Sequence, residues 1–141
     1  MEVRRRRNRP HAHSQNWREI NMGEMIATRE AFGRALAACG AENRDIVVLD
    51  ADLSKATMSS VFQKAFPERF FNVGIAEGDL IDTAAGLAAA GKIPFACTFA
   101  VFAAGRAFEQ IRNSVAYPNL NVKICGSHGG IAVGWDGATH Q

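Results

Sequence analysis

Hydrophobic residues from Met25 onward form two kinds of pattern along the chain. Short continuous runs such as IVVL, Ile46 to Leu49, are typical of strands that are covered on both faces. Between the runs, hydrophobic positions recur at helical spacing. The expected strands cover 46–49, 70–73, 93–99 and 122–126. The expected helices cover Met25 up to a stop at Gly40, then 61–66, 80–90 and 103–117.

The order of these elements predicts the fold class. Strands alternate with helices through the whole segment, which indicates an α/β domain with a mostly parallel sheet and helices on both faces. In such sheets ligands gather at the carboxyl ends of the strands. Residues 25–141 are therefore expected to form one domain with a binding site at that edge.

The first 24 residues differ from the rest. They lack hydrophobic periodicity and carry four consecutive arginines, Arg4 to Arg7, so residues 1–24 are expected to be a basic, disordered tail. A nucleic-acid arm or an organelle-targeting segment is an alternative. A further alternative is translation assigned too early, with Met22 or Met25 as the true start.

Charge and cysteine content narrow the class of protein. The chain has 141 residues and a formal net charge of +2. The first 24 residues hold six Arg against three Glu, so the remainder carries a net charge of −1 and is not expected to bind nucleic acid. Cys39, Cys97 and Cys125 are scattered, which argues against a metal site and favours a reducing, cytoplasmic setting. No apolar run is long enough for a membrane helix.

Residues that can take part in ligand binding or catalysis follow each expected strand. The set is Asp50 and Asp52, then Glu77, then Phe99 and Phe102, then Ser127 and His128. Each has an ordinary explanation, because an acid at a helix start is usually a cap and paired phenylalanines are usually core. Their recurrence at one edge of the sheet favours a site. Phosphate-binding glycine motifs are absent from the sequence, so a nucleotide fold is not indicated.

Four motifs make the chain similar to a known family. The combination of GIAE, TFAVF, SHGG and DGATHQ closely resembles the pyrimidine-binding domain of transketolase, over roughly Met25 to Gln141. That domain opens the C-terminal half of the single-chain enzyme or the C-terminal subunit of its split forms. The YPNLNVKI segment and the TFAVF context favour transketolase over deoxyxylulose phosphate synthase, which remains an alternative.

The resemblance gives Glu77 a specific role. In this family the glutamate of GIAE bonds the N1′ nitrogen of the aminopyrimidine of thiamine diphosphate. That bond favours the imino tautomer, whose 4′ nitrogen removes the C2 proton of the thiazolium. A carboxyl that donates to a ring nitrogen must be protonated, so the site must be dry. The apolar neighbours Phe71, Val73, Ile75 and Phe99 are expected to keep it so.

Other roles follow from the same resemblance. Phe102 is expected to stack on the pyrimidine with Phe99 in support, and Asp52 to lie near the cofactor. Histidines matching the family's substrate contacts hydrogen-bond the sugar where charge develops, so two of them are also expected to be catalytic. The expected substrate-binding residues are Arg29, His128, Asp136 and His140, and the expected catalytic residues are Glu77, His128 and His140.

The sequence also departs from the family pattern. Gly78 and Asp79 stand after the glutamate in place of the usual residues, and Ala56 stands where a phosphate-contacting serine is common. Trp135 replaces an acid before DG, and Gly105 stands where some members have a third aromatic. Family members continue beyond THQ, so the pyrimidine domain is expected to be incomplete.

The resemblance implies a partner. In transketolases the diphosphate of the cofactor, with its magnesium or calcium, is held by a GDG-containing domain that is not in this sequence. A homo- or hetero-oligomer is therefore expected, which transfers a two-carbon ketol unit between sugar phosphates of the pentose phosphate pathway. The chain is expected to be inactive without that partner, and a non-catalytic interaction domain is the other alternative.

Overall fold

The computed structural model describes residues 25–141, so the expected tail of residues 1–24 lies outside the described residues. The centre of the fold is a four-stranded sheet with the order β2-β1-β3-β4. The strands are β1 (Ile46–Asp50), β2 (Phe70–Asn72), β3 (Ile93–Phe99) and β4 (Lys123–Ser127). All three neighbouring pairs are parallel. The predicted α/β class and parallel sheet are confirmed.

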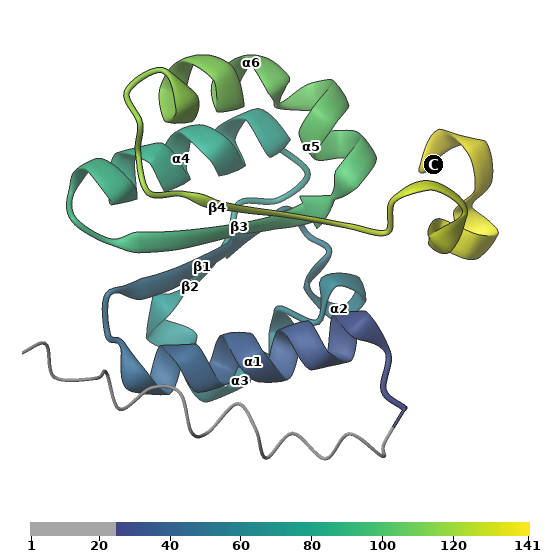
Figure 1. Ribbon diagram of the computed structural model, residues 1–141, viewed down its shortest axis with the longest axis horizontal. Coiled ribbons are helices and arrows are strands. Elements are labelled where there is room, and N and C mark those ends of the chain that lie inside the picture. The colour runs from purple at the N-terminus through teal and green to yellow at the C-terminus, as the bar shows by residue number, and fades with distance from the viewer. Residues whose placement is uncertain (1–24) are drawn as a thin grey trace, which may run out of the picture.

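Helices cover both faces of the sheet, as Figure 1 shows. One layer contains α1 (Thr28–Glu42), α2 (Ser54–Thr57), α3 (Ser60–Ala65) and the 3₁₀ turn η3 (Pro67–Arg69). The other contains α4 (Glu77–Ala89), α5 (Ala100–Arg106), α6 (Phe108–Gln110) and the π-helical turn η4 (Ile111–Ala116). Each crossover places its helix on a face, as parallel pairing requires.

Each face of the sheet has its own hydrophobic core. Val47 and Leu49 of β1 pack with the small-residue helix α4, whose Ala84 and Ala85 allow a close approach to the strands. Val48 points to the opposite face and packs with Leu36 of α1 and Phe62 of α3. Both faces of β1 are buried, which explains why its sequence is a continuous apolar run rather than an alternating one.

Two glycines let α1 lie close to its neighbours. A Cβ at Gly33 would come within 2.5 Å of the backbone oxygen of Met58. A Cβ at Gly40 would come within 2.4 Å of the Phe62 ring. These contacts bring α1 against α3 and the preceding turn, where Met58 adopts a left-handed φ of 62°.

The expectation of a single helix over 103–117 is wrong. The first helix of this segment begins at Ala100 and ends before Ala107, whose φ of −113° and ψ of 10° are not helical. The backbone N–H of Ala107 bonds to Phe102 O, which widens the turn, and Ile111–Ala116 then winds as a π-helix. The hydrophobic period of this segment shows a buried face but does not register the wider turns. The break changes the direction of the chain beside Arg106.

The chain beyond β4 folds over the end of the sheet. The segment η5 (Gly130–Thr139) consists of 3₁₀ turns separated at Gly134 and Gly137, which have φ of 72° and 66°. Only glycine adopts such angles without strain, so these residues set the path of the DGATHQ segment. No helix among residues 25–141 is long and apolar enough to cross a bilayer.

Candidate functional site

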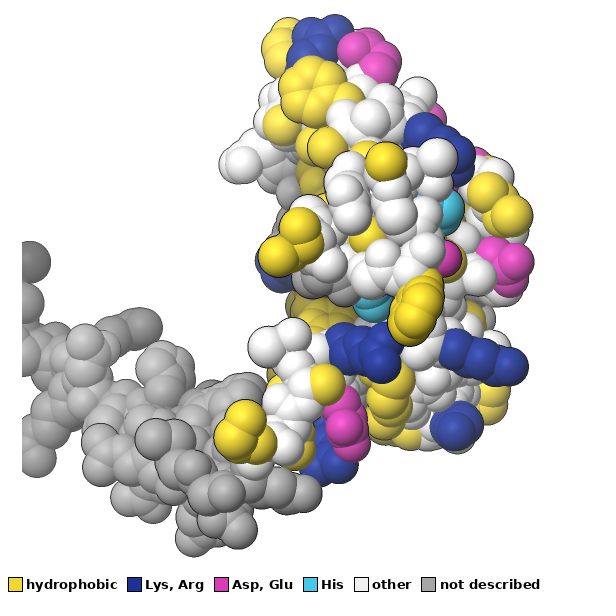
Figure 2. Space-filling view, turned by 90° about the vertical axis from the view of Figure 1, so that its right-hand side faces the viewer, with side chains coloured by type: hydrophobic (Ala, Val, Ile, Leu, Met, Phe, Trp, Pro, Cys, Tyr) yellow, Lys and Arg dark blue, Asp and Glu magenta, His cyan; other side chains and the backbone are white. Residues whose placement is uncertain are grey.

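The parallel register brings the strand ends together at one edge of the sheet. Asp50 pairs with both Asn72 and Cys97, and Phe99 pairs with Ser127. This is the edge at which η5 lies, and Figure 2 views it from outside, with histidine side chains visible among apolar ones. The predicted gathering of chemically active residues at this edge is therefore present in the fold.

Glu77 is the first residue of α4 and is buried, with only 3% of its surface exposed. Within residues 25–141 its carboxylate has one hydrogen-bond donor, Nη1 of Arg106, at 3.4 Å from each oxygen. The carboxylate accepts no bond from the backbone at the helix start, so it does not act as a capping group. A buried acid that does not cap its helix is consistent with a functional role.

The expected dry surroundings of Glu77 are built differently from the sequence-based expectation. Phe71 and Ile75 are exposed, at 43% and 75%, whereas Val73 packs against the core and Phe99 is buried. These residues are neighbours in sequence, but Gly74 adopts a φ of 76° and the chain turns there, which leaves Ile75 exposed. Two of the four side chains expected to keep the site dry are therefore exposed to solvent.

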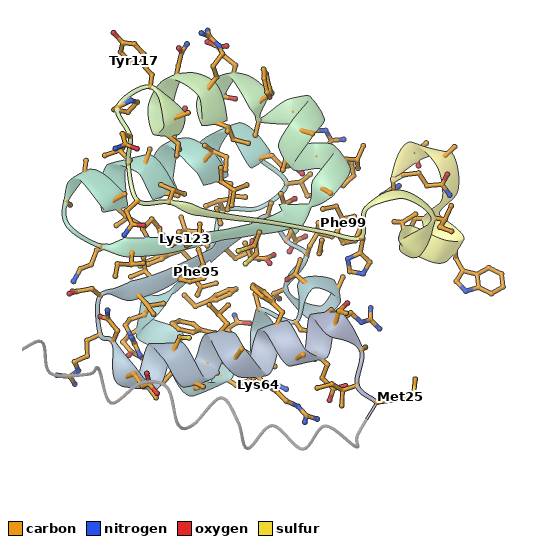
Figure 3. The ribbon with its side chains drawn as sticks, in the orientation of Figure 1. Met25, Lys64, Phe95, Phe99, Tyr117 and Lys123 are labelled. Atoms are coloured by element: carbon orange, nitrogen blue, oxygen red, sulfur yellow. The ribbon has the colours of Figure 1, made fainter. Side chains whose placement is uncertain are left out.

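An aromatic row runs from Glu77 toward the C-terminal segment. The guanidinium of Arg106 lies over the ring of Phe102, 4.4 Å from its centroid. The Phe102 ring stacks with Phe99 at 5.9 Å and an interplanar angle of 13°. Phe99 in turn lies 4.5 Å from the imidazole of His128. Figure 3 shows Phe99 at the end of β3, between the helical layer and η5.

His140 closes the same row. Its imidazole meets Phe102 edge-on at 5.2 Å and Phe99 at 6.1 Å. Five residues predicted from the sequence therefore lie in one continuous group of contacts, which runs from the buried acid through the ring pair to the two imidazoles. The members are Glu77, Phe99, Phe102, His128 and His140, with Arg106 between the first and the third.

His128 follows β4 in a left-handed conformation, with a φ of 55°. Its Nδ1 is 2.8 Å from the hydroxyl of Ser127, which fixes the orientation of the ring. Burial lowers the pKa of His128, and the nearby Arg29 guanidinium lowers it further, while Asp136 opposes the shift. At neutral pH the imidazole is therefore neutral and can either donate or accept a hydrogen bond.

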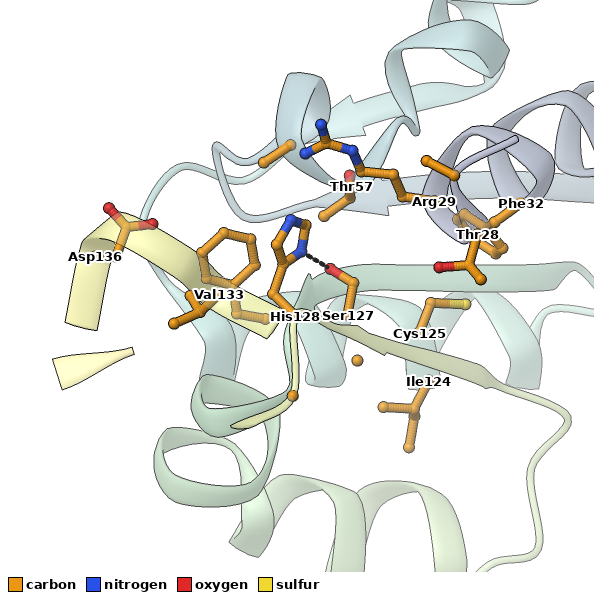
Figure 4. Close-up of a pocket in the computed structure, with 15 residues that line it drawn as sticks. Thr28, Arg29, Phe32, Thr57, Ile124, Cys125, Ser127, His128, Val133 and Asp136 are labelled. Atoms are coloured by element: carbon orange, nitrogen blue, oxygen red, sulfur yellow. Dashed lines mark hydrogen bonds between the residues drawn. The ribbon is translucent and has the colours of Figure 1, made fainter. Parts of the chain in front are cut away.

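A cavity of about 890 Å³ lies beside the aromatic row, between the N-terminal end of α1 and the end of β4. Its lining includes Arg29, Phe99, His128 and Asp136. Figure 4 shows Arg29 facing His128 across the cavity, with Asp136 on the C-terminal segment. Ala56 also lines it, so the missing serine hydroxyl noted in the sequence falls on this wall. The cavity is large enough for a phosphorylated sugar.

Asp52 does not join this group. It is exposed, has a left-handed φ of 63°, and exchanges hydrogen bonds with Asn72 at 3.1 Å. Asn72 Oδ1 also accepts from the backbone N–H of Gly74. Asp52 therefore belongs to a connection between the loops that follow β1 and β2, and it does not line the cavity.

Asp50, one of the residues expected at the carboxyl edge of the sheet, is fully buried at the end of β1. Its carboxyl accepts hydrogen bonds from the hydroxyls of Thr57 at 2.9 Å and Ser59 at 2.8 Å, and from the backbone N–H of Leu53. Burial raises the pKa of Asp50, and these bonds offset part of that rise. The signal was an acid at the end of a wholly apolar run. Its role is to hold the turn that places Thr57 at the cavity.

The residues present fit an aminopyrimidine and do not fit a metal ion. A buried carboxyl beside a stacked pair of aromatic rings matches a flat ring that needs one hydrogen bond to a nitrogen. Among residues 25–141 no three acidic, histidine or cysteine side chains cluster closely enough to hold a metal.

Comparison with known proteins supplies the family. Residues 24–141 match the family described as transketolase, pyrimidine binding domain. The chain is 58% identical over 113 residues to the putative transketolase C-terminal section of Methanocaldococcus jannaschii, covering 80% of this chain and 36% of that protein. It is 43% identical over 121 residues to human transketolase, covering 85% of this chain and 19% of that enzyme.

Solved structures agree. A split-gene transketolase, named as an inactive beta4 tetramer, matches 72% of this chain and 34% of its own, with 70% identity and a TM-score of 0.67. Transketolase from Leishmania mexicana matches 82% of this chain and 18% of its own, with 30% identity and a TM-score of 0.73. The chain spans between about a fifth and a third of the length of these relatives. It belongs to the transketolase family and corresponds to the pyrimidine-binding domain.

Proposed function

We propose that the chain contributes the aminopyrimidine side of a thiamine diphosphate site for two-carbon ketol transfer between sugar phosphates. The observation that carries the proposal is the buried carboxyl of Glu77, placed at the same sheet edge as the Phe99–Phe102 stack. A helix cap needs no burial, and a core pair of rings needs no buried acid nearby. The two together suit a flat heteroaromatic ring.

When bound, thiamine diphosphate supplies a carbon nucleophile that adds to the carbonyl of a ketose. Glu77 would hold a proton at the ring nitrogen N1′, while the rings of Phe102 and Phe99 would pack against the pyrimidine face. In this structure the Arg106 guanidinium forms an ion pair with the Glu77 carboxylate. Because the Arg106 side chain is 55% exposed, it can move into solvent and leave the carboxyl free for the cofactor.

The cavity beside the aromatic row would receive the sugar phosphate. Neutral His128, oriented by Ser127, and His140 would hydrogen-bond the carbonyl or hydroxyl groups at which charge develops. Asp136 would hold a neighbouring hydroxyl, and Arg29 at the rim would pair with the phosphate. Asp52 does not contact these residues, so any place for it near the cofactor would lie on the side of the partner.

The chemistry needs a second domain. No metal cluster lies within residues 25–141, so the diphosphate and its magnesium or calcium would be held by a transketolase domain on another subunit or segment. The 36% coverage of a relative named as a C-terminal section supports this division. The assembled enzyme would be a homo- or hetero-oligomer, and the free thiols are consistent with a cytoplasmic setting.

The proposal is tested on Glu77 in the complex of the full chain with a subunit that supplies the diphosphate-binding domain. Glu77→Gln keeps the shape and one hydrogen bond, so cofactor binding should change by about tenfold or less, roughly 1.4 kcal/mol. Proton exchange at the cofactor's C2, followed by quench and NMR, should fall by a factor of ~100 or more. Glu77→Asp should also slow exchange, because the shorter arm moves the carboxyl away from N1′.

A helix-start role predicts a different order. Asp is favoured in the first turn, so Glu77→Asp would be nearly silent and Glu77→Gln would lose some stability. Unchanged C2 exchange in both variants would exclude the catalytic role and favour a non-catalytic interaction domain.

Calorimetry tests the need for a partner, since the chain alone should bind thiamine diphosphate weakly. Tight magnesium-dependent binding by the lone chain would refute the need for a partner.

A further inference from the structure

Two of the three cysteines are direct neighbours across the sheet. Cys97 of β3 and Cys125 of β4 are register partners on adjacent parallel strands. Paired residues on neighbouring strands lie about 4.8 Å apart, within the ~4.4–6.8 Å range of Cα separations that a disulfide spans. Both side chains pack into the core layer between the sheet and α1. No change of register is needed for the two sulfurs to meet.

The two thiols differ in exposure. Cys97 is completely buried, whereas Cys125 is only half-buried and lines the 890 Å³ cavity. Figure 4 shows Cys125 on the wall of the cavity beside Ile124. A small solute that enters the cavity therefore reaches Cys125 first, with Cys97 directly behind it.

The surroundings of the two thiols also make Cys125 easier to ionise than Cys97. Cys125 donates to the backbone oxygen of Lys123 at 3.6 Å. The neighbouring Cys97 thiol lowers the pKa of the Cys125 thiol against the effect of burial, while Cys125 and burial together raise the pKa of Cys97 well above its usual range. The accessible thiol is thus the more readily ionised one, which is the arrangement of an attacking thiol and a resolving thiol.

We propose that Cys97 and Cys125 form a peroxide-sensitive thiol pair that closes to a disulfide within the sheet. The Cys125 thiolate attacks one oxygen of hydrogen peroxide, the O–O bond breaks, and hydroxide leaves to give a sulfenic acid on Cys125. The sulfur of Cys97 then attacks that sulfur, loses its proton, and displaces water. One peroxide is reduced to two waters, and two thiols are oxidised to one disulfide.

The bond would affect the neighbouring cavity wall. It would link β3 and β4 two residues before Phe99 and Ser127, the last residues of these strands. It would also remove the thiol of Cys125 from the cavity wall. Oxidation is therefore expected to protect the chain from thiol reagents and to stabilise the β3–β4 pair by closing the loop between the two strands.

The test uses the full chain treated with a small excess of hydrogen peroxide, then alkylated and digested with trypsin. The three cysteines fall in separate tryptic peptides, 35–44, 93–106 and 124–141, so each linkage is identifiable by mass. The expected product is a linked pair of the second and third peptides, with a mass loss of two hydrogen atoms from the intact chain, reversed by dithiothreitol. The control variant Cys39→Ser should give the same product.

Two further variants keep the proposal falsifiable. Cys97→Ala keeps the buried site apolar, and it should stop the oxidation of Cys125 at the sulfenic acid, trapped as a dimedone adduct. Cys125→Ala should leave Cys97 unmodified. The proposal is overturned if peroxide links Cys39 to either cysteine, joins two chains, or leaves wild-type Cys125 as an overoxidised acid with no linked peptide pair.

Discussion

Nη1 of Arg106 lies 3.4 Å from both carboxylate oxygens of Glu77, and the same guanidinium lies over the ring of Phe102. The acid is 3% exposed and the arginine side chain 55% exposed, so the pair joins the buried end of the site to solvent. No other side chain among residues 25–141 donates to this carboxylate. The guanidinium is thus the side-chain partner of the Glu77 carboxylate among these residues.

Arg106→Met is expected to lower the free energy of unfolding of the full chain by about 1–2 kcal/mol. Removal of the guanidinium leaves a buried carboxylate without a partner, but the solvent-facing side of the pair keeps the cost below the ~3–5 kcal/mol of a fully buried one. The measurement is chemical denaturation at fixed protein concentration. Arg112→Met is the matched control, because within residues 25–141 Arg112 forms its ion pair with exposed Glu109, and it should change stability by less than about 0.5 kcal/mol.

The double variant Glu77→Gln with Arg106→Met tests whether the two effects share one cause. A neutral amide does not need the guanidinium, so the double variant should be more stable than Arg106→Met alone, with a coupling of about 1 kcal/mol. Additive losses in the double variant would mean that Arg106 acts through its packing on Phe102 and not through the carboxylate.

His128 is expected to titrate below the ordinary pKa of a histidine, as measured by the NMR shifts of its imidazole. Arg29→Gln should raise the pKa of His128, because it removes a positive charge that disfavours the imidazolium. Asp136→Asn should lower it further, because it removes the charge that favours the imidazolium. A shift in the same direction for both variants would indicate a conformational change instead.

A pH-dependent stability effect is expected from Asp50. Burial raises its pKa in the folded chain, so the native state holds the proton more tightly than the unfolded chain does. As pH rises from the unfolded value of about 4 through the raised native value, the wild type should lose stability relative to Asp50→Asn. The stability difference, measured at several pH values, should then level off. A relative gain by the wild type with rising pH would show that Thr57 and Ser59 stabilise the ionised form more than burial disfavours it.

The sequence predicted the sheet well because buried parallel strands appear as continuous apolar runs. The expected strand at 93–99 coincides with β3, and the edge residues follow from strand order alone. The chain turns at Ala107 and Met58 were not predictable, because nothing in the hydrophobic period reports a left-handed or wide turn. The pairing of Glu77 with Arg106 was not predictable either, because the two residues lie 29 positions apart in the sequence and no local pattern relates them. Asp52 was placed by resemblance, and its bond to Asn72 depends on a loop conformation that spacing does not specify.

The last prediction compares two glycines inside helices. Gly33→Ala in α1 should destabilise the chain by about 2 kcal/mol or more, because the new methyl group would come within 2.5 Å of Met58 O, a backbone atom that cannot turn aside. At Gly86 in α4 an added Cβ would meet no atom of residues 25–141 within 4 Å beyond its own helix, so Gly86→Ala should stabilise the chain by about 0.5–1 kcal/mol through helix propensity alone. Both are measured by chemical denaturation of the full chain. The two changes have the same intrinsic effect on a helix, so their difference isolates the contact between α1 and the turn at Met58. Equal effects at the two positions would mean that α1 can move away from that turn at little cost. The N-terminal end of α1 would then be an adaptable wall of the cavity, and Arg29 on it would not hold a fixed distance from His128.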